Sequence, residues 1–370
     1  ELQASLNLQE GHLMRAALFD FGAARKGRLL IVIHHLAVDG VSWRILLEDL
    51  QTACSQLAQN QPAALPSKTT SYKVWAENLT EYAGSEAVKK EIDYWLKLSQ
   101  IAEPRLPVDY VCDDRDTVAT SARVSVSLDE SSTRALLQDV PQVYNTRIEE
   151  ALLTALVRTM NTWTGTPELL VNFEGHGREE LFDHVEIHRT VGWFTTIYPV
   201  WLSLQNIHNQ ADALKSIKEQ MRNIPNRGIG YGIMRYLSPD TEIRKMFNNL
   251  PKAGISFNYL GQIDKPLLTT SLFTLSHDYK GPEQSPKHPR PCALDINAIV
   301  TEGRLQMEWT YSTRIHRKTT VESLTQTYIN NLKTLISHCQ SPDAGGFTPS
   351  DFPGAKIGQK DLDKLMSKFK

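Results

Sequence analysis

The sequence predicts an α/β fold in which apolar strands are covered by helices. Residues 29–33 are apolar at every position, a pattern typical of a central strand with helices on both of its faces. The segment after this strand repeats apolar residues at helical spacing, at Ile45, Leu46, Leu50, Ala53, Leu57 and Ala58. Further along, two strand patterns at 294–300 and 304–311 flank a Glu-Gly pair, which predicts a hairpin.

The first strand ends in two adjacent histidines, which are followed by an aspartate and a glycine. Because successive side chains of a strand point to opposite faces, His35 shares a face with Ile33, and His34 lies on the other. Only one of the two imidazoles can therefore face a given cleft, and each needs a partner if it is buried. Gly40 permits a tight turn with positive φ, and Asp39 can orient this loop by accepting a hydrogen bond.

The chain divides into two predicted units, residues 1–110 and 111–370. A helix is expected near 87–98, and residues 101–118 are then rich in proline and aspartate, which is typical of a linker. The second unit begins with a strand on which apolar residues alternate, at Val124, Val126 and Leu128.

A long helix follows in the second unit, with an apolar face made by Ala151, Leu152, Ala155, Leu156 and Met160. Thr146 and Glu149 fit a capping box at its start, and Gly165 ends it. The proline-rich residues 281–291 exclude regular structure.

Composition agrees with a soluble module of the cytoplasm. The 370 residues carry a net charge of -2, so neither a nucleic acid nor an anionic membrane is expected as a partner. No apolar stretch is long enough to span a bilayer, and no charged-then-apolar leader opens the chain. The cysteines lie far apart without CxxC spacing and are expected to be reduced thiols: Cys54, Cys112, Cys292 and Cys339.

Several familiar cofactor motifs are excluded. His184 and His188 are four residues apart, but the valine and isoleucine between them favour extended structure, so no metal site is predicted. The glycine run 228–232 follows a proline rather than a strand, which argues against a dinucleotide site. The chain has neither a Gly-x-Ser-x-Gly elbow nor a P-loop.

The histidine segment carries the first family resemblance. His34-His35-Leu-Ala-Val-Asp39-Gly40 resembles the HHxxxDG signature of the condensation superfamily of nonribosomal peptide synthetases. The following Ser-Trp-Arg-Ile-Leu is similar to the epimerization branch of that superfamily.

A second segment distinguishes the branches. Residues 169–178 form an apolar strand that opens into a turn with glycines on both sides of His176. Arg178 is close enough in sequence to be the ion partner of Glu174 or a substrate clamp. Residues 174–179 resemble the EGHGRE motif of epimerization domains, in which the first glutamate is assigned as a catalytic acid or base. Condensation domains typically lack this motif.

Three further blocks extend the resemblance over more than half of the chain. Residues 190–199 resemble the TVGWFTxxxP block, residues 228–232 the glycine-rich segment, and residues 257–262 the FNYLGQ block. The resemblance implies two lobes, each like chloramphenicol acetyltransferase with a mixed sheet and flanking helices, and an active-site tunnel between them. It also implies that a loop near 281–291 crosses from the second lobe onto the first.

The chain departs from the family at its start. Only 33 residues precede His34, which is a shorter lead than family members have, and there is no initiating methionine. We therefore expect an N-terminally incomplete first lobe with exposed strand edges and apolar faces.

The resemblance implies epimerization of an L-aminoacyl or peptidyl thioester on the 4'-phosphopantetheine arm of an upstream peptidyl carrier domain, alongside neighbouring synthetase domains and without an intrinsic cofactor or metal. Inverting the α-carbon requires two acid/base groups on opposite sides, and His35 and Glu174 are the candidates. The sequence leaves open which of them deprotonates the L form. Burial would raise the pKa of Glu174, and pairing with Arg178 would lower it.

Other residues receive supporting roles. Asn258 and Tyr259 could donate to the enolate oxygen, although strand alternation places Asn258 towards the site and Tyr259 towards the core. Asp39 is expected to orient the histidine loop, and Trp43 and Trp193 to pack. Two alternatives stay open: a condensation domain, which would form an amide, and a catalytically inactive module that holds carrier proteins.

Overall fold

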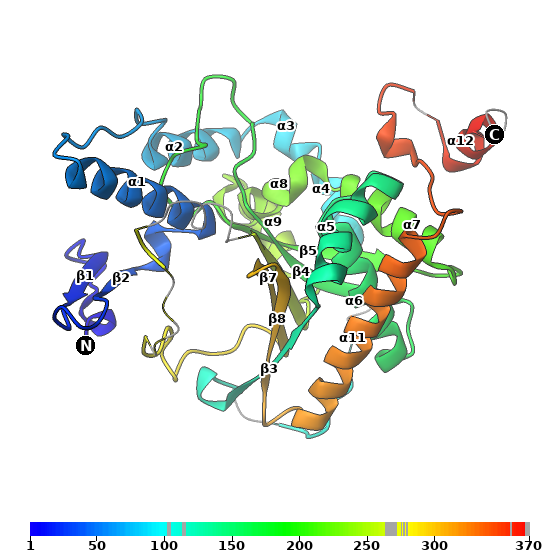
Figure 1. Ribbon diagram of the computed structural model, residues 1–370. Helices are drawn as coiled ribbons and strands as arrows, with labels where there is room; N and C mark the ends of the chain where they lie inside the picture. Colours follow the sequence, from blue (N-terminus) through cyan, green and yellow to red (C-terminus); the bar gives the residue numbers. More distant parts are fainter. Residues whose placement is uncertain are drawn as a thin grey trace.

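A six-stranded mixed sheet lies at the centre of the molecule (Figure 1). The computed structural model describes residues 1–101, 105–112, 116–262, 272–274, 276, 278, 280–355 and 357–366. In spatial order the strands are β3 (Ser121–Ser127), β8 (Arg304–Ser312), β7 (Leu294–Thr301), β6 (Ile255–Gln262), β4 (Glu168–Gly175) and β5 (Thr196–Ser203). Strands β7, β6 and β4 run parallel to one another, and the other neighbouring pairs are antiparallel.

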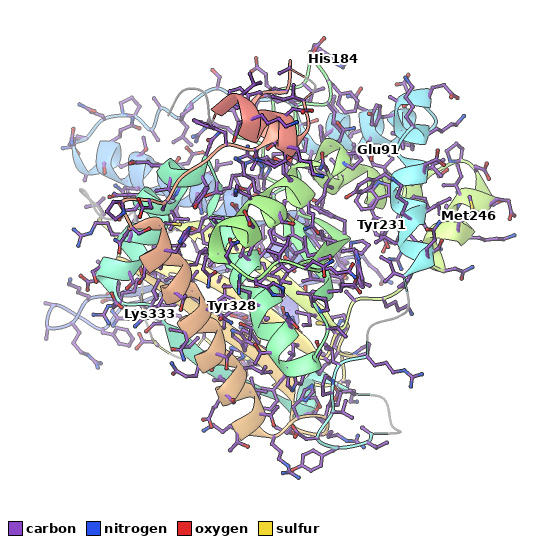
Figure 2. All side chains as sticks on the ribbon, turned by 90° about the vertical axis from the view of Figure 1, so that its right-hand side faces the viewer. Glu91, His184, Tyr231, Met246, Tyr328 and Lys333 are labelled. Carbon is purple, nitrogen blue, oxygen red and sulfur yellow. The ribbon has the colours of Figure 1, made fainter. Side chains whose placement is uncertain are left out.

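Helices cover one face of this sheet (Figure 1). They are α5 (Glu130–Tyr144), α6 (Ile148–Thr164) and α11 (Lys318–Cys339), with α7 (Gln210–Arg222) packed against α6. On α11, Tyr328 (labelled in Figure 2) is fully buried, and its hydroxyl donates a hydrogen bond to the carbonyl of Leu152 at 3.1 Å.

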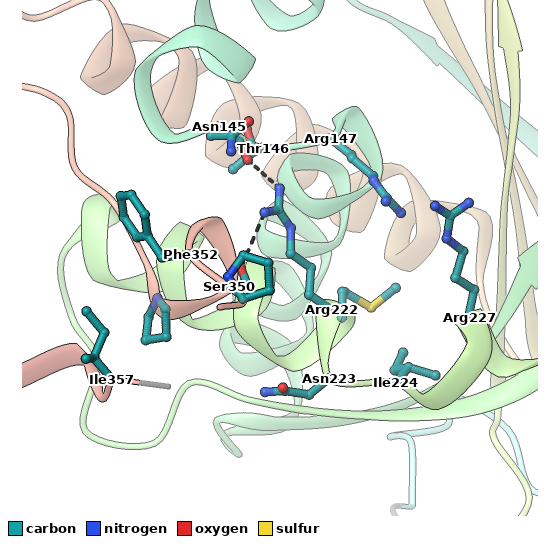
Figure 3. A pocket seen from close by; sticks show the side chains of 13 residues that line it. Asn145, Thr146, Arg147, Arg222, Asn223, Ile224, Arg227, Ser350, Phe352 and Ile357 are labelled. Carbon is teal, nitrogen blue, oxygen red and sulfur yellow. Dashed lines mark hydrogen bonds between the residues drawn. The ribbon is translucent and has the colours of Figure 1, made fainter. Parts of the chain in front are cut away.

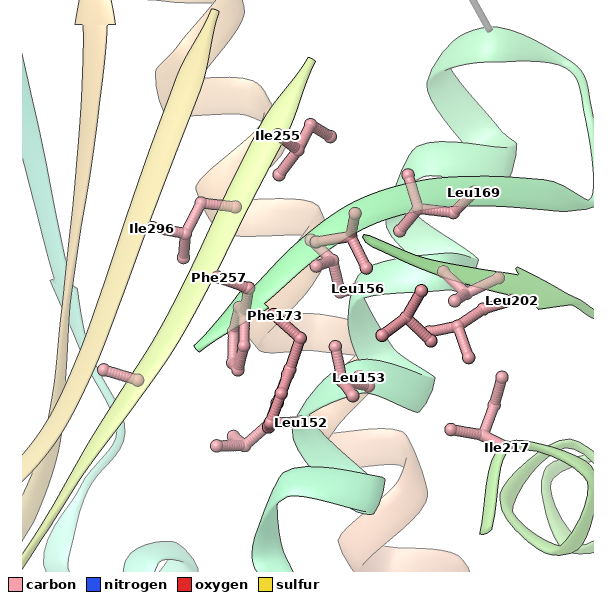
Figure 4. Packing of buried hydrophobic residues seen from close by; sticks show 14 of the residues in the cluster. Leu152, Leu153, Leu156, Leu169, Phe173, Leu202, Ile217, Ile255, Phe257 and Ile296 are labelled. Carbon is pink, nitrogen blue, oxygen red and sulfur yellow. The ribbon is translucent and has the colours of Figure 1, made fainter. Parts of the chain in front are cut away.

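The hydrophobic core between the sheet and the helices takes up one face of each strand, which leaves the side chains of the other face available to a site. Leu153 and Leu156 of α6 are fully buried in the same cluster as Phe173 of β4 and Phe257 of β6 (Figure 4). Because side chains alternate along a strand, the residues between these apolar ones face away from the helices. That second face is polar, and it carries Glu174, Ser256, Asn258, Asp295, Asn297, Glu308 and Thr310.

Several predicted elements are confirmed. Strands β7 and β8 form the expected hairpin, and Glu302 and Gly303 take the turn with φ of 51° and 70°. Helix α6 ends at Gly165, whose φ of 76° is the left-handed conformation expected after a helix. The predicted capping box is wrong by one residue, because Arg147 is the N-cap and its backbone N–H donates to Glu150 at 2.8 Å.

The strand before the two histidines differs from prediction. It is β2 (Arg28–Ile33), and it pairs with β1 (Met14–Phe19) in a two-stranded antiparallel sheet. Its residues are exposed or half-buried, so the expected central strand with two covered faces is wrong. Leu18 is 75% exposed and Leu29 is 41% exposed. The apolar run shows only that β2 is able to be buried on both faces. Whether it is buried depends on which other segments pack against it, and the strand sequence does not determine that.

Helix α1 (Gly40–Ala58) is confirmed, whereas the predicted helix near 87–98 is broken. In its place, α3 (Glu86–Lys89) and α4 (Ile92–Leu96) follow α2 (Tyr72–Tyr82). The break lies at Glu91, which is buried and accepts hydrogen bonds from Trp95 at 3.2 Å and from Asn226 at 2.6 Å. The ring of Tyr231, labelled with Glu91 in Figure 2, lies 5.3 Å from that of Trp95.

Residues 72–101 pack into the hydrophobic core of the six-stranded sheet, whereas strands β1 and β2 lie outside that core. Trp75 and Trp95 belong to the hydrophobic cluster that contains the six-stranded sheet, and the ring of Trp95 lies 6.1 Å from that of Tyr198. Strands β1 and β2 stand apart from that sheet, with α1 and α2 above them (Figure 1). Of the predicted linker, residues 102–104 and 113–115 lie outside the described residues, and 105–112 contain neither helix nor strand.

The segment near 281–291 contacts the first 28 residues of the chain and the edge of the six-stranded sheet. Arg28 forms an ion pair with Asp278 at 2.6 Å, and Gln3 donates a hydrogen bond to the carbonyl of Lys280 at 2.8 Å. Further on, Thr117 and Pro289 form an isolated bridge beside β3. The segment therefore links residues 1–28 to the edge of the six-stranded sheet.

The remaining regular elements are short. They are α8 (Ile229–Gly232), α9 (Thr241–Asn248), α12 (Gln359–Met366), the π-helix η6 (Ile233–Leu237), and the 3-10 turns η1 (Gln3–Ser5), η2 (His35–Ala37), η3 (Lys97–Gln100), η4 (Val118–Thr120), η5 (Pro225–Gly228) and η7 (Pro349–Asp351). Within the described residues, every helix is too short or too polar to cross a membrane.

Candidate active site

The two histidines take different positions at the end of β2. The strand ends at Ile33, and His34 caps the turn η2 by accepting the Leu36 backbone N–H at Nδ1, 3.2 Å away. His35 is exposed, and its ring centroid lies 5.4 Å from that of Trp193. The predicted alternation fails because the turn begins before His35. The two rings still have different surroundings, because the Leu36 backbone N–H engages His34 and the His35 side chain is exposed.

Asp39 organises the turn after the histidines. It is the N-cap of α1, and its carboxylate accepts the Ser42 backbone N–H at 2.7 Å and the Phe194 backbone N–H at 3.1 Å. Gly40 is the first residue of α1 and does not have a positive φ, so the turn predicted for it is wrong. The capped helix begins directly after Asp39, whose own backbone is extended.

Arg178 is the ion partner of Asp39 rather than of Glu174. Its Nη2 lies 3.1 Å from Asp39, and the two side chains are only 7% and 2% exposed. Its Nη1 donates to the carbonyls of Ile187 and Thr190 at 2.7 and 2.8 Å. Burial lowers the pKa of Arg178, and the Asp39 carboxylate opposes that change. The side chain joins the two motifs and is not exposed enough to clamp a substrate.

A glycine makes this junction possible. Gly177 has a φ of +66°, and a Cβ atom there would lie 1.7 Å from the carbonyl oxygen of Phe194. The guanidinium of Arg178 lies 4.0 Å from the centroid of the Phe194 ring. The glycine next to His176 thus allows close approach of another backbone segment.

Glu174 lies at the end of β4 on the polar face of the sheet. Its Oε2 accepts a hydrogen bond from Asn258 Nδ2 at 2.7 Å. Burial, together with the nearby carboxylate of Asp295, raises the pKa of Glu174 to about 7. Within the described part of the chain, no cation forms an ion pair with Glu174. Arg178 does not lower the pKa of Glu174, because its side chain pairs with Asp39.

The other predicted site residues differ in whether they face Glu174 or pack elsewhere. Asn258 faces Glu174, as alternation predicted, whereas Tyr259 packs partly against the core. Burial raises the pKa of Tyr259 to about 12, so its hydroxyl stays neutral. The ring of His176 accepts the Arg178 backbone N–H at 3.0 Å and lies 3.6 Å from Glu179, which gives it a role in the turn.

One short segment connects the two motifs. Ser42 of α1 donates to the carbonyl of Gly192 at 2.9 Å, and the next residue, Trp193, lies against His35. Four residues later, Ile197 is the cross-strand partner of Glu174 in the β4–β5 pair. Residues 192–197 thus run from the histidine turn to β5, the strand that pairs with the glutamate-bearing strand β4. The sequence assigned Trp193 to packing, and its ring packs on the candidate imidazole.

Further contacts fasten α1 to the second half of the chain. Arg44 donates to the carbonyl of Leu260 at the end of β6, at 2.9 Å. Arg189 forms ion pairs with Glu48 and Asp49. Arg44 lies in the Ser-Trp-Arg-Ile-Leu stretch, so this stretch connects the histidine motif to the FNYLGQ block.

No metal centre emerges from the described residues. Within them, no three or more His, Cys, Asp or Glu side chains cluster as metal ligands would. His184 lies at the outer edge of the molecule, in a loop without regular structure (Figure 2). The four cysteines all lie in the described part of the chain, and no disulfide joins any two of them.

Comparison with known proteins identifies the family. A family model described as the condensation domain matches residues 1–357. The chain belongs to the condensation-domain family. This domain is 47% identical over 99% of its length to a linear gramicidin synthase of Brevibacillus parabrevis, and 40% identical over its whole length to surfactin synthase subunit 1 of Bacillus subtilis. It spans only 5% and 10% of these two synthetases.

Solved structures confirm the predicted fold. The epimerization domain from the third module of tyrocidine synthetase B superimposes with a TM-score of 0.84 at 37% identity, covering 91% of this chain and 74% of that one. SgcC5 protein from Streptomyces globisporus has the same fold, with a TM-score of 0.65 at 14% identity, covering 90% of this chain and 73% of that one. The condensation-family α/β architecture, a mixed sheet with flanking helices, is therefore established for this domain.

The domain also has a pocket of about 730 Å³ outside the candidate site (Figure 3). It is lined by residues near the start of α6, the end of α7 and the segment 349–357. Arg222 in this pocket is already engaged, by Glu150 and Asp351 at 3.1 Å each. None of the predicted site residues lines this pocket, so we do not assign the chemistry to it.

The raised pKa of Glu174 predicts a pH-dependent effect on stability. In the unfolded chain this carboxyl titrates near 4.5, and in the folded domain it titrates near 7. A raised pKa favours the folded state below pH 4.5, and this contribution is lost as the pH rises to 7. We expect Glu174→Gln, which keeps an acceptor for Asn258, to stabilise the domain at pH 8 by up to about 3 kcal/mol and to change little at pH 4.5.

Urea denaturation at the two pH values measures this effect. Glu180→Gln, an exposed glutamate next to the same motif, is the matched control and should behave like the wild type at both. Equal stabilities of wild type and Glu174→Gln at pH 8 would show that the Glu174 carboxylate is not destabilised in the fold.

Proposed function

We propose that this domain epimerizes the α-carbon of an L-aminoacyl or peptidyl thioester presented on the phosphopantetheine arm of a carrier protein. The α-hydrogen of a thioester is a weak carbon acid, because the carbonyl delocalises the resulting carbanion as an enolate. Inversion removes the proton from one face and returns a proton to the other. Two acid/base groups on opposite sides of the carbon perform this exchange.

The protonation behaviour of Glu174 carries the proposal. A carboxyl with a pKa of about 7 is protonated in roughly half of the molecules at neutral pH, so it can give or accept a proton without a large penalty. The hydrogen bond from Asn258 fixes its orientation. A carboxyl on a polar but partly buried surface, with its pKa displaced towards neutrality, is typical of an acid/base residue.

His35 is the second acid/base group of the proposal. It comes from the turn after β2, and Trp193 supports its ring. Imidazole titrates close to neutral pH as a residue type, which suits proton transfer in either direction. Asn258 has a second amide N–H beyond the one given to Glu174, and that donor is our candidate for the enolate oxygen.

The proposed substrate implies the partners. We infer an upstream peptidyl carrier domain that delivers the thioester and neighbouring synthetase domains on the same chain, in line with the gramicidin and surfactin synthases to which the domain is similar. The isomerase activity needs no cofactor of its own, since the thioester supplies the acidity and the two side chains move the protons.

Deuterium exchange tests the function. A carrier loaded with an L-aminoacyl or peptidyl thioester is mixed with the full-length protein in deuterated water, and α-deuteration and configuration are followed. We expect the D form to accumulate with deuterium at the α-carbon. Retention of both the L configuration and the hydrogen would contradict the proposal. Amide formation with a second, acceptor carrier and no exchange would instead identify a condensation enzyme.

A further inference from the structure

A second carboxyl lies on the polar face of the sheet, outside every motif of the sequence. Asp295 of β7 is half-buried and accepts a hydrogen bond from Asn297 at 3.3 Å. Asn297 is the register partner of Asn258 in the parallel β6–β7 pair, and Asn258 donates to Glu174. Glu174, Asn258 and Asn297 therefore form a row across three neighbouring strands, and Asp295 lies two residues before Asn297 on the last of them.

The positive charges near this row are engaged elsewhere. Arg290 donates to Ser121 at 2.6 Å and forms an ion pair with Asp116, and Arg123 forms an ion pair with Glu308 at 3.4 Å. The charged or titratable groups facing Asp295 are Glu174, Cys292, Glu308, Arg290 and Arg123. Within the described residues, neither Asp295 nor Glu174 forms an ion pair of its own.

We propose that Asp295 is a positioning residue of the epimerization site, which acts on Glu174 through its negative charge and through the Asn297–Asn258 pair. The inference rests on the proposed function of Glu174 and adds a residue that the family motifs do not contain. Asp295 transfers no proton to the substrate. Its charge makes ionisation of Glu174 less favourable, so that a larger fraction of Glu174 is protonated at neutral pH than without Asp295.

Electrostatics supports this assignment. Burial is the largest cause of the raised pKa of Glu174, and the Asp295 carboxylate is the second. The pKa of Asp295 is also raised, chiefly by burial, and Arg290, the hydrogen bond from Asn297 and Arg123 offset part of that rise. Like charges in a partly desolvated site separate the two titrations, a pattern typical of acid/base pairs.

The test is Asp295→Asn, which preserves shape and removes the charge. We expect the pH profile of α-hydrogen exchange to move to lower pH by roughly one pH unit, because Glu174 loses a like charge. Glu308→Gln is the matched control: it removes a carboxylate from the same sheet face that Arg123 already neutralises, and its profile should stay near that of the wild type. Asp295→Glu keeps the charge and should restore the wild-type profile.

Carbon-13 NMR supplies a readout that does not need turnover. In protein labelled at the glutamate side-chain carboxyls, the resonance missing from Glu174→Gln identifies Glu174, and its titration should move down in Asp295→Asn. If Asp295→Asn does not fold, Asp295→Ser serves in its place. An unchanged Glu174 titration, or a rate loss equal at every pH, overturns the inference. A wild type without deuterium uptake refutes the proposed function, and the NMR titration still decides the role of Asp295.

Discussion

Replacing Glu174 by glutamine, or His35 by glutamine, lowers the rate of thioester epimerization by a factor of about 10² to 10⁴, the usual contribution of a positioned acid/base group. Glutamine at 174 still accepts the hydrogen bond that Asn258 donates at 2.7 Å, so the local geometry is kept and only proton transfer is lost. Glutamine at 35 is large enough to remain against the Trp193 ring. Chiral analysis of the hydrolysed product over time measures the rate.

The controls for this experiment lie in or beside the same motifs. His176→Gln removes an exposed imidazole that supports a turn, and Glu180→Gln removes an exposed carboxylate. We expect both to retain most of the activity. Either active-site variant epimerizing within about threefold of the wild type would contradict the assignment of its residue to proton transfer, since a positioned acid/base group contributes far more than that.

Asp39→Asn destabilises the domain by about 3–5 kcal/mol, because it leaves the guanidinium of Arg178 buried without its counter-ion. Asparagine can still accept the Ser42 N–H and cap α1, but its amide nitrogen cannot accept the Phe194 N–H, so the loss reports the ion pair together with that hydrogen bond and not the cap. The pair is 7% and 2% exposed, so water cannot replace the lost carboxylate. Epimerization falls as well, since the pair holds the histidine turn against the EGHGRE turn.

Urea denaturation of a mutant cycle checks this prediction. Arg178→Met alone leaves Asp39 charged and buried, and the double variant Asp39→Asn/Arg178→Met should lose less stability than the sum of the single changes. Glu77→Gln breaks the exposed pair with Lys73 and serves as the control, with an expected change of at most about 1 kcal/mol. Asp39→Asn within about 1 kcal/mol of the wild type would mean that this ion pair does not join the two motifs.

Local patterns predicted the elements that depend on local chemistry. The hairpin with Glu302 and Gly303, the end of α6 at Gly165 and the face of Asn258 all follow from periodicity or turn preference, and all are confirmed. The motif resemblance placed the chain in the condensation family, which the comparisons bear out. These features are determined within a few residues of sequence.

Features that depend on distant segments could not be predicted in the same way. Arg178 and Asp39 are 139 residues apart, and they meet because the segment 192–194 passes close to Gly177. The proximity of Asp295 to Glu174 follows from the register of three strands. The exposure of β2 depends on which neighbours flank it, and no periodicity within the strand encodes that.

The division into lobes at residue 110 stays a prediction. Trp75 and Trp95 lie in the cluster that also contains Phe194 and Tyr198 of the second half, so the packing of residues 72–101 does not follow the boundary that composition suggested. Aromatic side chains near a linker can pack on either neighbouring unit, and sequence spacing does not distinguish the two.

The most direct test of the central claim, that His35 and Glu174 act on opposite faces of one carbon, is α-hydrogen exchange from each enantiomer separately. L- and D-aminoacyl thioesters on a carrier are incubated in deuterated water with His35→Gln and with Glu174→Gln. Each variant keeps one base, so each should deuterate one enantiomer without inverting it, and the two variants should choose opposite enantiomers. Exchange of both enantiomers by one variant and of neither by the other would show that a single residue handles both faces, and would contradict the account.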